Sequence, residues 1–430
     1  MAIEVTLIMM GFLVLLMFGV PIAIALLATG FAGLVTVGNL GQAFGSLALV
    51  PYSAVASGTL IVVPLFVLTG QIAFAAGISR DAYDMAYRWL GRFRGGLAMA
   101  SIAACAAFAA TSGSSVATAA TVGRIAIPEM KRFGYADALA TGAVAAGGVL
   151  GIMIPPSVTF VIYGIVTETS IGKLLLAGII PGLMTATVFI LGISLITRFR
   201  PEIAPVGEAF PWSERLRYLT RASGILVLFG AIMGGIYSGL FTPSEAAAVG
   251  GAVAVVLALL RRAKTRLILH SFSESAKTAA MIFLLLVGAL VFAKFMAISG
   301  TASEIARFLA TVPLPKIVTL ILILLLYVPL GMFLDGISMM LITLPVVFPA
   351  VLALGYDPIW LGVVMTKMIE IGALTPPVGF NCYIIKGVAP EVPLETIFRG
   401  AGTFVLLELV SLGLLVAFPE IALWLPRSMF

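Results

Sequence analysis

Charge is scarce in this sequence, and histidine and cysteine are nearly missing. Charged residues make up 10% of the 430 residues, whereas soluble globular domains carry about 25%. A single histidine, His270, leaves no material for a histidine metal centre or a Ser-His-Asp triad. The two cysteines, Cys105 and Cys382, lie in apolar segments without metal-site spacing and are expected to be buried. The composition therefore argues against a transition-metal protein and against an intramembrane enzyme, which would need clustered acids, bases or nucleophiles.

Long apolar segments dominate the sequence. Hydrophobic residues account for 61% of the chain, and the mean hydropathy is +1.17. Apolar runs of about 18 or more residues, each long enough to cross a bilayer, recur throughout. The net charge of +6 is attributed to basic cytoplasmic loops and not to nucleic-acid binding. The sequence predicts a polytopic helical protein that is surrounded by the lipid bilayer.

The first apolar run is expected to be a retained span. Residues 1–6 (MAIEVT) lack the basic n-region of a signal peptide, and the run continues past Ala28, which is too long for a cleaved leader. Residues 5–27 and 29–50 predict one or two apolar segments, with Pro21 blurring the boundary between them. A further span is predicted at residues 58–78.

Two pairs of adjacent prolines interrupt long apolar segments. Pro155-Pro156 lies within residues 136–165, and Pro376-Pro377 lies within residues 358–386. A proline removes a backbone donor and clashes with the preceding helical turn, so two in succession open a helix. In lipid, opened backbone persists only where protein buries it or where it lines a polar cavity. Both segments are therefore predicted to be broken helices.

Two further apolar segments have the pattern of re-entrant hairpins. Residues 95–133 are interrupted by residues 111–115 (TSGSS) and are flanked by basic residues at both ends, which predicts entry and exit on the cytoplasmic side. Residues 317–354 turn around Asp335-Gly336, and Lys316 alone flanks them, as expected on the outer face. Five predicted crossings separate the two hairpins, an odd number, so the hairpins open to opposite sides.

The two halves of the chain also match residue by residue. A constant offset of 221 carries Pro128 to Pro349, Gly134-Tyr135 to Gly355-Tyr356, and Pro155-Pro156 to Pro376-Pro377. It also carries Ser114 at one hairpin tip to Asp335 at the other. Matching sequence in opposite orientation is an inverted-topology repeat, which is typical of secondary transporters.

These features predict an all-α polytopic membrane protein with about 10–11 transmembrane helices and two re-entrant hairpins. The expected parts are N-terminal scaffold helices (1–78), an amphipathic interfacial helix (79–94), a first repeat (95–196), central scaffold helices and loops (197–316), and a second repeat (317–430).

Small and hydroxylated residues gather where backbone is expected to be open. In the first half these are Thr111, Ser112, Gly113, Ser114, Ser115, Thr118 and Thr121, facing residues 151–157. In the second half they are Asp335, Gly336 and Ser338, facing Gly372, Thr375, Gly379 and Asn381. Hydroxyls and free carbonyls suit sodium, and helix N-termini suit a carboxylate. The alternative is that small residues at the tips only allow close helix packing.

The predicted spans contain few charged residues. Asp335 at the second tip is expected to bind a cation or to cap the tip, because a lone carboxylate at that depth is costly. Lys367 and Glu370 are three residues apart on one helical face and predict an internal ion pair, with a direct substrate role as the alternative. Lys294 is a further cation within a predicted span. Arg124 either lies near a bound anion or extends to the cytoplasmic interface.

At this level of detail the sequence resembles a known family. The segments TSGSSVATAATVG (111–123), IPPS (154–157) and IGALTPPVG (371–379), together with Asn381, resemble the large membrane subunit of TRAP transporters, the tripartite ATP-independent periplasmic carriers of the bacterial inner membrane. The resemblance covers essentially the whole chain. It implies a sodium-coupled elevator belonging to the wider ion-transporter superfamily, a separate small four-helix membrane subunit, and a periplasmic binding protein that delivers organic carboxylates such as C4-dicarboxylates or sialic acid.

The resemblance also assigns residues. It places sodium at the hairpin tips against the broken helices, which in this sequence are Ser112, Gly113, Ser114 and Ser115 with Gly151 and Pro155, and Asp335 and Gly336 with Gly372 and Thr375. The residues expected to contact substrate are Ser115, Thr118, Thr121, Ser157, Thr375 and Asn381. Two alternatives remain, a stand-alone cation-coupled carrier without a binding protein and, much less favoured, a sodium channel.

Overall fold

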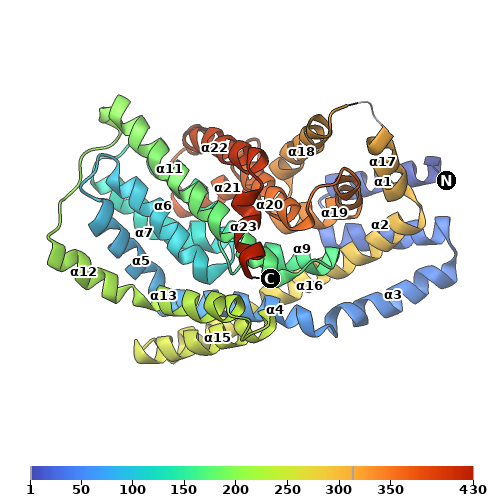
Figure 1. Cartoon of the computed structure of the whole chain (residues 1–430), viewed down its shortest axis with the longest axis horizontal. Coiled ribbons are helices and arrows are strands. Elements are labelled where there is room, and N and C mark those ends of the chain that lie inside the picture. Colours follow the sequence, from blue (N-terminus) through green and yellow to red (C-terminus); the bar gives the residue numbers. More distant parts are fainter. Residues whose placement is uncertain (1, 312–313, 430) are drawn as a thin grey trace.

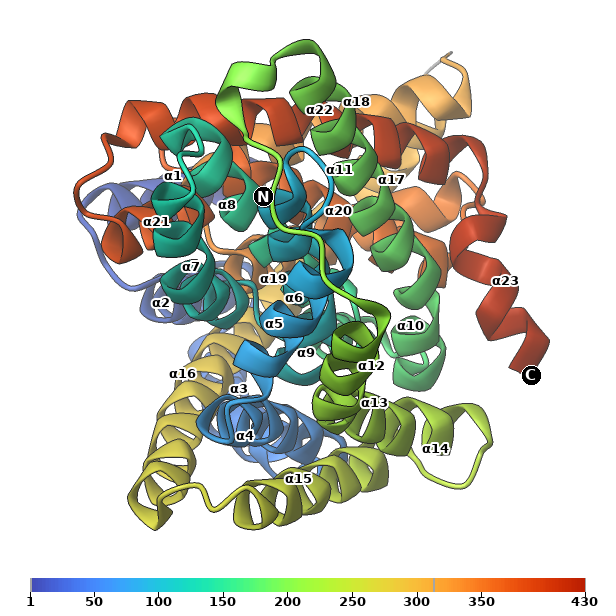
Figure 2. The same cartoon turned by 90° about the vertical axis from the view of Figure 1, so that its left-hand side faces the viewer.

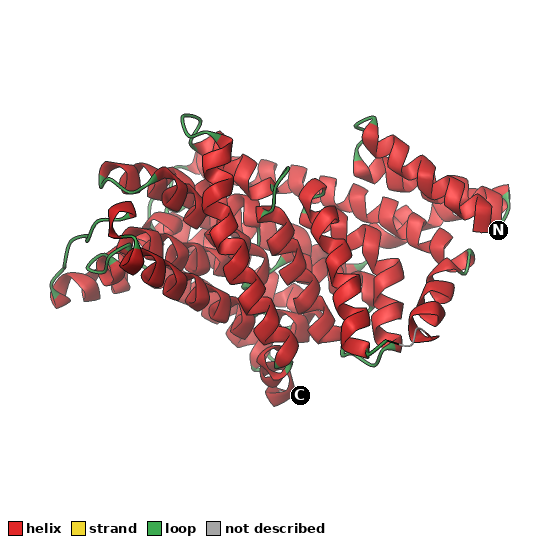
Figure 3. Cartoon of the chain, turned by 90° about the horizontal axis from the view of Figure 1, so that it is seen from above, coloured by secondary structure: helices red, strands yellow, loops and turns green. Residues whose placement is uncertain are grey.

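The computed structural model describes residues 2–311 and 314–429, and the secondary-structure elements named in those ranges are all helices (Figure 3). Seven of the described helices are long and apolar enough to cross a membrane, or up to nine spans if each of two bent helix pairs counts as one. The shorter apolar helices are Glu4–Met17, Ile22–Val37, Leu40–Val55 and Gly96–Ser112. The predicted all-α polytopic class is confirmed.

The N-terminal part contains more helices than the sequence indicated. In place of one or two segments there are three helices of 16 residues each, α1 (Ala2–Met17), α2 (Ile22–Val37) and α3 (Leu40–Val55). Pro21 precedes α2, and the Asn39 side chain caps α3 by accepting a hydrogen bond from Gln42 N at 2.8 Å. A short 3₁₀ turn, η1 (Gly58–Ile61), then leads into α4 (Val62–Ala75). The boundaries were missed because the apolar composition runs through these turns.

The first repeat follows the predicted hairpin and broken helix. The amphipathic helix is α5 (Ile78–Leu90), and the hairpin is the pair α6 (Gly96–Ser112) and α7 (Ser115–Arg132). The broken helix is the pair α8 (Asp137–Met153) and α9 (Val158–Thr167), bent by 41° at the break. The repeat ends with α10 (Ile171–Ala177) and α11 (Ile179–Phe199).

The central part departs from the prediction at two places and contains one predicted hairpin. The stretch 198–221, expected to be a loop, contains a 3₁₀ turn, η2 (Pro201–Ile203), and α12 (Trp212–Arg221). The span expected at 275–297 is the last part of a 34-residue helix, α16 (Thr265–Ile298), and α17 (Thr301–Thr311) follows it. The predicted hairpin of residues 222–260 is present as α13 (Ser223–Phe229), a π-helical turn η3 (Gly230–Gly234), α14 (Gly235–Tyr237) and α15 (Pro243–Leu260).

The second repeat contains α18 (Lys316–Phe333), α19 (Gly336–Ala353), α20 (Pro358–Leu374) and α21 (Phe380–Val388). Adding the 221-residue offset to the bounds of α7 and α8 gives the bounds of α19 and α20. Both Pro-Pro peptide bonds are cis. The sequence repeat is therefore also a repeat of helix bounds. The chain ends with α22 (Leu394–Ala417) and the unpredicted α23 (Glu420–Met429).

The helices assemble into two groups that lie on opposite sides of the molecule. Helices α3, α4, α15 and α16 lie along one side, whereas α11, α18 and α22 lie along the other, with α8, α9 and α20 between them (Figures 1 and 2). Helix α16 packs on α2, α3 and α4, and α8 packs on α6, α7, α20 and α22. At the α8–α22 contact, a Cβ built on Gly400 would lie 1.8 Å from the Ala138 carbonyl oxygen, so only glycine fits. The two repeats meet through α8, α20 and α22.

Candidate functional site

The first hairpin tip is a tight turn whose hydroxyls bond to one another. Helix α6 ends at Gly113, which has a positive φ of 61°, and Ser114 caps α7 by accepting from Ala117 N at 3.3 Å. Thr118 Oγ1 donates to the Ser114 carbonyl oxygen at 2.8 Å and lies 2.8 Å from Ser112 Oγ. Because the one Thr118 proton goes to Ser114, Ser112 is the donor in the second bond.

This tip lies directly against the first helix break. A Cβ built on Gly113 would be 2.6 Å from the Pro156 carbonyl oxygen, and one built on Gly151 would be 2.4 Å from the Ser114 carbonyl oxygen. Pro155 and Pro156 are buried between the ends of α8 and α9. Both glycines are thus needed for close approach. The structure brings together the predicted residues 112–115, Gly151 and Pro155.

Ser157 closes the break. Its hydroxyl donates to the Ile152 carbonyl oxygen at 2.6 Å and accepts from Phe160 N at 3.4 Å, and the side chain is fully buried. The residue therefore joins the end of α8 to the start of α9. Thr121, nearly two turns beyond the tip on α7, is also buried.

The second tip is arranged differently. Asp335 caps α19 by accepting from Ser338 N at 3.1 Å and from the Ser338 hydroxyl, so the predicted tip-capping role is confirmed. A Cβ on Gly336 would lie 2.5 Å from Ile369 Cγ2, and one on Gly372 would lie 2.6 Å from Gly331 Cα. The tip thus packs against the side of α20.

Thr375 caps the C-terminal end of α20 at the second break. Its hydroxyl donates to the Ile371 carbonyl oxygen at 2.6 Å. Within the described residues no hydrogen bond joins Asp335 to Thr375. The second tip therefore meets its broken helix through close packing at Gly336 and Gly372.

Asn381 connects the two repeats. Its side chain is fully buried, accepts a hydrogen bond from Ser115 Oγ at 2.7 Å, and donates to the Ala145 carbonyl oxygen at 3.1 Å. Two residues that the sequence assigned to substrate contact, Ser115 and Asn381, thus lie side by side although 266 positions separate them.

Lys367 forms two buried salt bridges, and the sequence predicted only one of them. Lys367 Nζ lies 2.7 Å from Glu370 Oε2, which confirms the predicted internal ion pair, and 2.6 Å from Glu408 Oε2 on α22. Lys367 also donates to Thr185 Oγ1 on α11 at 2.6 Å, and all three charged side chains are fully buried. Glu370 Oε1 and Glu408 Oε1 have no hydrogen-bond partner within residues 2–311 and 314–429. The signal that could have indicated Glu408 was a lone carboxylate in the apolar segment 394–417.

The structure also shows the degree of burial of the two cysteines and of two basic residues within the predicted membrane segments. Cys105 and Cys382 are free and fully buried, as expected. Arg124 and Lys294 are exposed on the surface of the chain.

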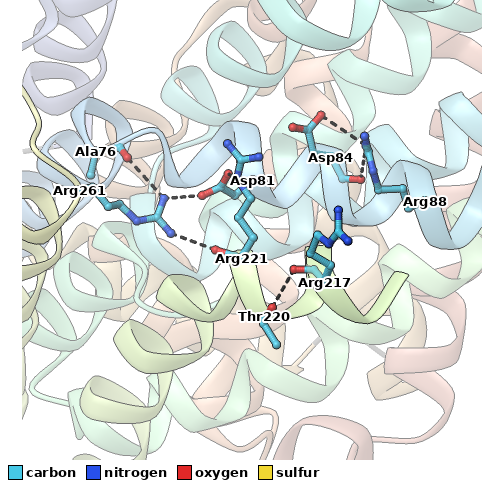
Figure 4. Close-up of polar contacts among 8 residues, drawn as sticks. All are labelled: Ala76, Asp81, Asp84, Arg88, Arg217, Thr220, Arg221 and Arg261. Carbon is cyan, nitrogen blue, oxygen red and sulfur yellow. Dashed lines mark hydrogen bonds and ion pairs between the residues drawn. The ribbon is translucent and has the colours of Figure 1, made fainter. Parts of the chain in front are cut away.

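A charged network joins the amphipathic helix α5 to its neighbours (Figure 4). The nearly buried Asp81 carboxylate contacts Arg221 at 3.0 Å and also pairs with Arg261, the residue directly after α15. Arg261 additionally donates to the carbonyl oxygens of Ala76 and Arg221, at 3.4 and 3.0 Å. The network therefore holds α5, the end of α12 and the end of α15 together.

A further ion pair links the first hairpin to the second repeat. Lys131 at the end of α7 donates to Glu391 Oε1 at 2.8 Å and lies 3.5 Å from Asp137. This hydrogen bond holds the pKa of Glu391, in the loop before α22, below its usual value.

Duplicated helical hairpins, each lying against a broken helix within a bundle of apolar helices, define a multi-pass membrane protein of the secondary-transporter class. A solved structure, "Crystal structure of the Alcanivorax borkumensis YdaH transporter reveals an unusual topology", has a similar fold. Its TM-score is 0.61 at 17% identity, covering 88% of this chain and 90% of that one.

The family is shown by sequence comparison. Residues 9–421 match the family model "Tripartite ATP-independent periplasmic transporter, DctM component". The C4-dicarboxylate TRAP transporter large permease protein DctM of Pseudomonas aeruginosa is 37% identical, over 86% of each chain. The sialic acid large permease SiaM of Vibrio cholerae is 33% identical over 97% of each, and the ectoine/5-hydroxyectoine large permease UehC of Ruegeria pomeroyi is 31% identical over 96% of each. This chain belongs to the DctM family of TRAP transporter large permeases, multi-pass proteins of the inner membrane.

Proposed function

We propose that this chain is the membrane permease of a sodium-driven importer of small organic acids. It works with a small four-helix membrane subunit and with a periplasmic binding protein that delivers the substrate. Family membership supports the tripartite assembly. Relatives named for C4-dicarboxylates and sialic acid support a carboxylate substrate.

The observation that carries the sodium assignment is the contact between the first tip and the first break. Ser112 Oγ, Thr118 Oγ1 and the Ser114 carbonyl oxygen form one hydrogen-bonded cluster, and the Pro156 carbonyl oxygen faces Gly113. Hard cations are bound by oxygen ligands of this kind. The corresponding second half-site contains Asp335 and Gly336 with Gly372 and Thr375. Its carboxylate supplies the charge that the first half-site lacks.

On this proposal, the substrate binds between the two half-sites. Ser115 and Asn381 are its central contacts, because they already join the two repeats at 2.7 Å. The hydroxyls of Thr118, Thr121, Ser157 and Thr375 complete the polar surroundings. Helices α9 and α21 begin immediately after the two breaks, so their N-terminal amides are available to a carboxylate.

The movement proposed is that of an elevator, in which the two repeats slide as a body against α2, α4, α15 and α16. The most extensive helix contacts support this division: α16 packs mainly on α2 and α4, and α8 packs mainly on α6, α7 and α22. The Asp81 network at α5 lies at the joint between the two sets.

Uptake into proteoliposomes that contain this chain and its small subunit tests the proposal. Radiolabelled C4-dicarboxylates and sialic acid are supplied with and without an inward sodium gradient, and with and without the binding protein. Uptake is expected only with both the gradient and the binding protein. Equal uptake without a binding protein would instead support a stand-alone carrier. Equal uptake with potassium in place of sodium would contradict sodium coupling.

A further inference from the structure

An open cleft lies where α11 reaches the basic side of the protein. Its cavity volume is about 290 Å³, and it is lined by Phe93, Arg94, Ser194 and Arg198. The cleft is separate from the two half-sites, since none of these four residues belongs to a hairpin tip or to a helix break. Its position at the predicted cytoplasmic end of α11 is the level at which lipid headgroups lie.

The backbone around Arg94 is held in place by α11. Thr197 Oγ1 donates to the Arg94 carbonyl oxygen at 3.1 Å, and Arg94 forms an isolated β-bridge with Val206. The next residue, Gly95, has a φ of 73°, and a Cβ there would lie 2.8 Å from Thr197 Cγ2. The α5–α6 loop is therefore fixed against the last turns of α11, while the Arg94 side chain stays exposed.

The two arginines of the cleft form no ion pair with the part of the chain that the structure describes. Among the described residues, no salt bridge involves Arg94 or Arg198. Ser194 lies one helical turn before Arg198 on the same face of α11 and adds a hydroxyl to the cleft. Two unpaired guanidinium groups beside a hydroxyl match a phosphate group, which arginine binds with paired hydrogen bonds.

The same face of α11 is apolar below the cleft. Leu191 and Leu195 are 62% and 58% exposed, and they share a helical face with Ser194 and Arg198 because the spacings are three, four and seven residues. Phe199 is 77% exposed beside them. The surface thus changes from apolar to cationic along one helix, as a phospholipid changes from acyl chain to phosphate.

We propose that this cleft binds the phosphate of an anionic glycerophospholipid in the cytoplasmic leaflet. Arg94 and Arg198 contact the phosphate, Ser194 donates to one of its oxygens, and the acyl chains lie along Leu191 and Leu195. Because Arg94 precedes α6 and Arg198 ends α11, the bound lipid would join the entrance of the first hairpin to the last helix of the first repeat. The proposal depends on the membrane location alone and not on sodium coupling.

Lipid binding to the purified protein in detergent provides the test. Phosphatidylglycerol is titrated and its binding is followed by native mass spectrometry and by the thermal midpoint of the folded fraction. The double variant R94A/R198A is expected to bind phosphatidylglycerol about tenfold or more weakly than the wild type. The matched control R132A/R266A removes two other exposed arginines and is expected to bind as the wild type does. The variant R94K/R198K keeps the charge and is expected to lie between the two.

Three results would overturn the proposal. The first is wild-type affinity in R94A/R198A, and the second is the same loss in the control pair. The third is stabilisation of equal size by phosphatidylcholine or by inorganic phosphate, because the site would then not select an anionic lipid.

Discussion

Ser115 Oγ donates a hydrogen bond of 2.7 Å to Asn381 Oδ1, and this bond joins the first hairpin to the second broken helix. The Asn381 amide group is held from its other side by the Ala145 carbonyl oxygen at 3.1 Å. This is one of the polar contacts that join the two repeats, and it lies between residues that are expected to contact substrate.

Breaking this contact is expected to weaken substrate binding. Ser115→Ala and Asn381→Ala each leave a buried partner group unsatisfied, a loss of about 1–3 kcal/mol. The substrate concentration for half-maximal uptake should rise about tenfold in each, and the double variant should be less impaired than the sum of the two. Thr187→Ala, which removes an exposed hydroxyl bonded within α11, is the control. Strict additivity of the two changes would show that the residues act separately.

One substitution separates the helix cap that Asp335 provides from its proposed role in cation binding. Asn caps helices about as well as Asp does, so Asp335→Asn keeps the cap of α19 and removes the charge. The sodium concentration for half-maximal uptake is expected to rise about tenfold if the charge contributes to cation binding. Asp335→Ala should lose the cap as well and lower the thermal midpoint. An unchanged sodium dependence in Asp335→Asn would leave capping as the function of this residue.

Ser114→Ala tests the first half-site in the same assay. The change removes the hydroxyl that caps α7, while the Ser114 carbonyl oxygen stays in place. A higher sodium requirement is expected for Ser114→Ala than for Ser114→Thr, which keeps a capping hydroxyl. If both variants need the same sodium concentration as the wild type, the Ser114 hydroxyl is not part of a cation site.

Removing the positive charge of Lys367 is expected to destabilise the protein, because Lys367 is buried between Glu370 and Glu408. Lys367→Met leaves the carboxylates of Glu370 and Glu408 in an apolar interior, and removing one partner of a buried pair costs about 3–5 kcal/mol. Glu408→Gln keeps the Lys367–Glu370 pair and should be milder. Thermal unfolding in detergent checks this order, with Lys131→Met, at a partly exposed ion pair, as the control. A midpoint for Lys367→Met equal to that of the control would contradict the prediction.

The opposite orientation of the hairpins can be tested at two equivalent positions. Arg132 and Ala353 end α7 and α19, and both are exposed. Arg132→Cys and Ala353→Cys should react with a membrane-impermeant maleimide from opposite sides of the membrane. The native Cys105 and Cys382 are buried and should give little background. Labelling of both positions from one side would exclude an inverted repeat.

The salt bridges of Asp81 in α5 are expected to affect the movement of helices during transport. Asp81→Asn removes the partner of Arg221 and Arg261 and should loosen the joint between α5, α12 and α15. Substrate transport rate is expected to change while the half-maximal substrate concentration stays close to that of the wild type. Arg217→Ala, an exposed arginine of α12 outside the Asp81 contacts, is the control. A changed half-maximal concentration with an unchanged rate would show that the network acts on the binding site instead.

Local features were predictable because they depend on neighbouring residues. The double prolines open helices wherever they occur, and the 221-residue offset predicted which helices correspond, as the bounds of α19 and α20 confirm. The Lys367–Glu370 pair followed from a spacing of three residues on a helix. The Asp335 cap was one of two roles expected for a lone carboxylate at the depth of a hairpin tip. In contrast, the helix boundaries near Pro21 and Asn39 were not predicted, because a uniformly apolar sequence has no hydrophobic periodicity that marks where a helix ends.

Only the tertiary structure showed which distant residues meet. Glu408 is a lone carboxylate in the sequence, and its partner Lys367 reaches it because α20 packs on α22. Ser115 meets Asn381, and Asp81 meets Arg261, for the same reason: helix packing decides these contacts, and no local periodicity encodes them. The sequence by itself determined the membrane class, the repeat, the two tips and the two breaks. The tertiary structure decided how closely each hairpin tip packs against its helix break. The close approach depends on the missing side chains of Gly113 and Gly151 in the first repeat, and of Gly336 and Gly372 in the second.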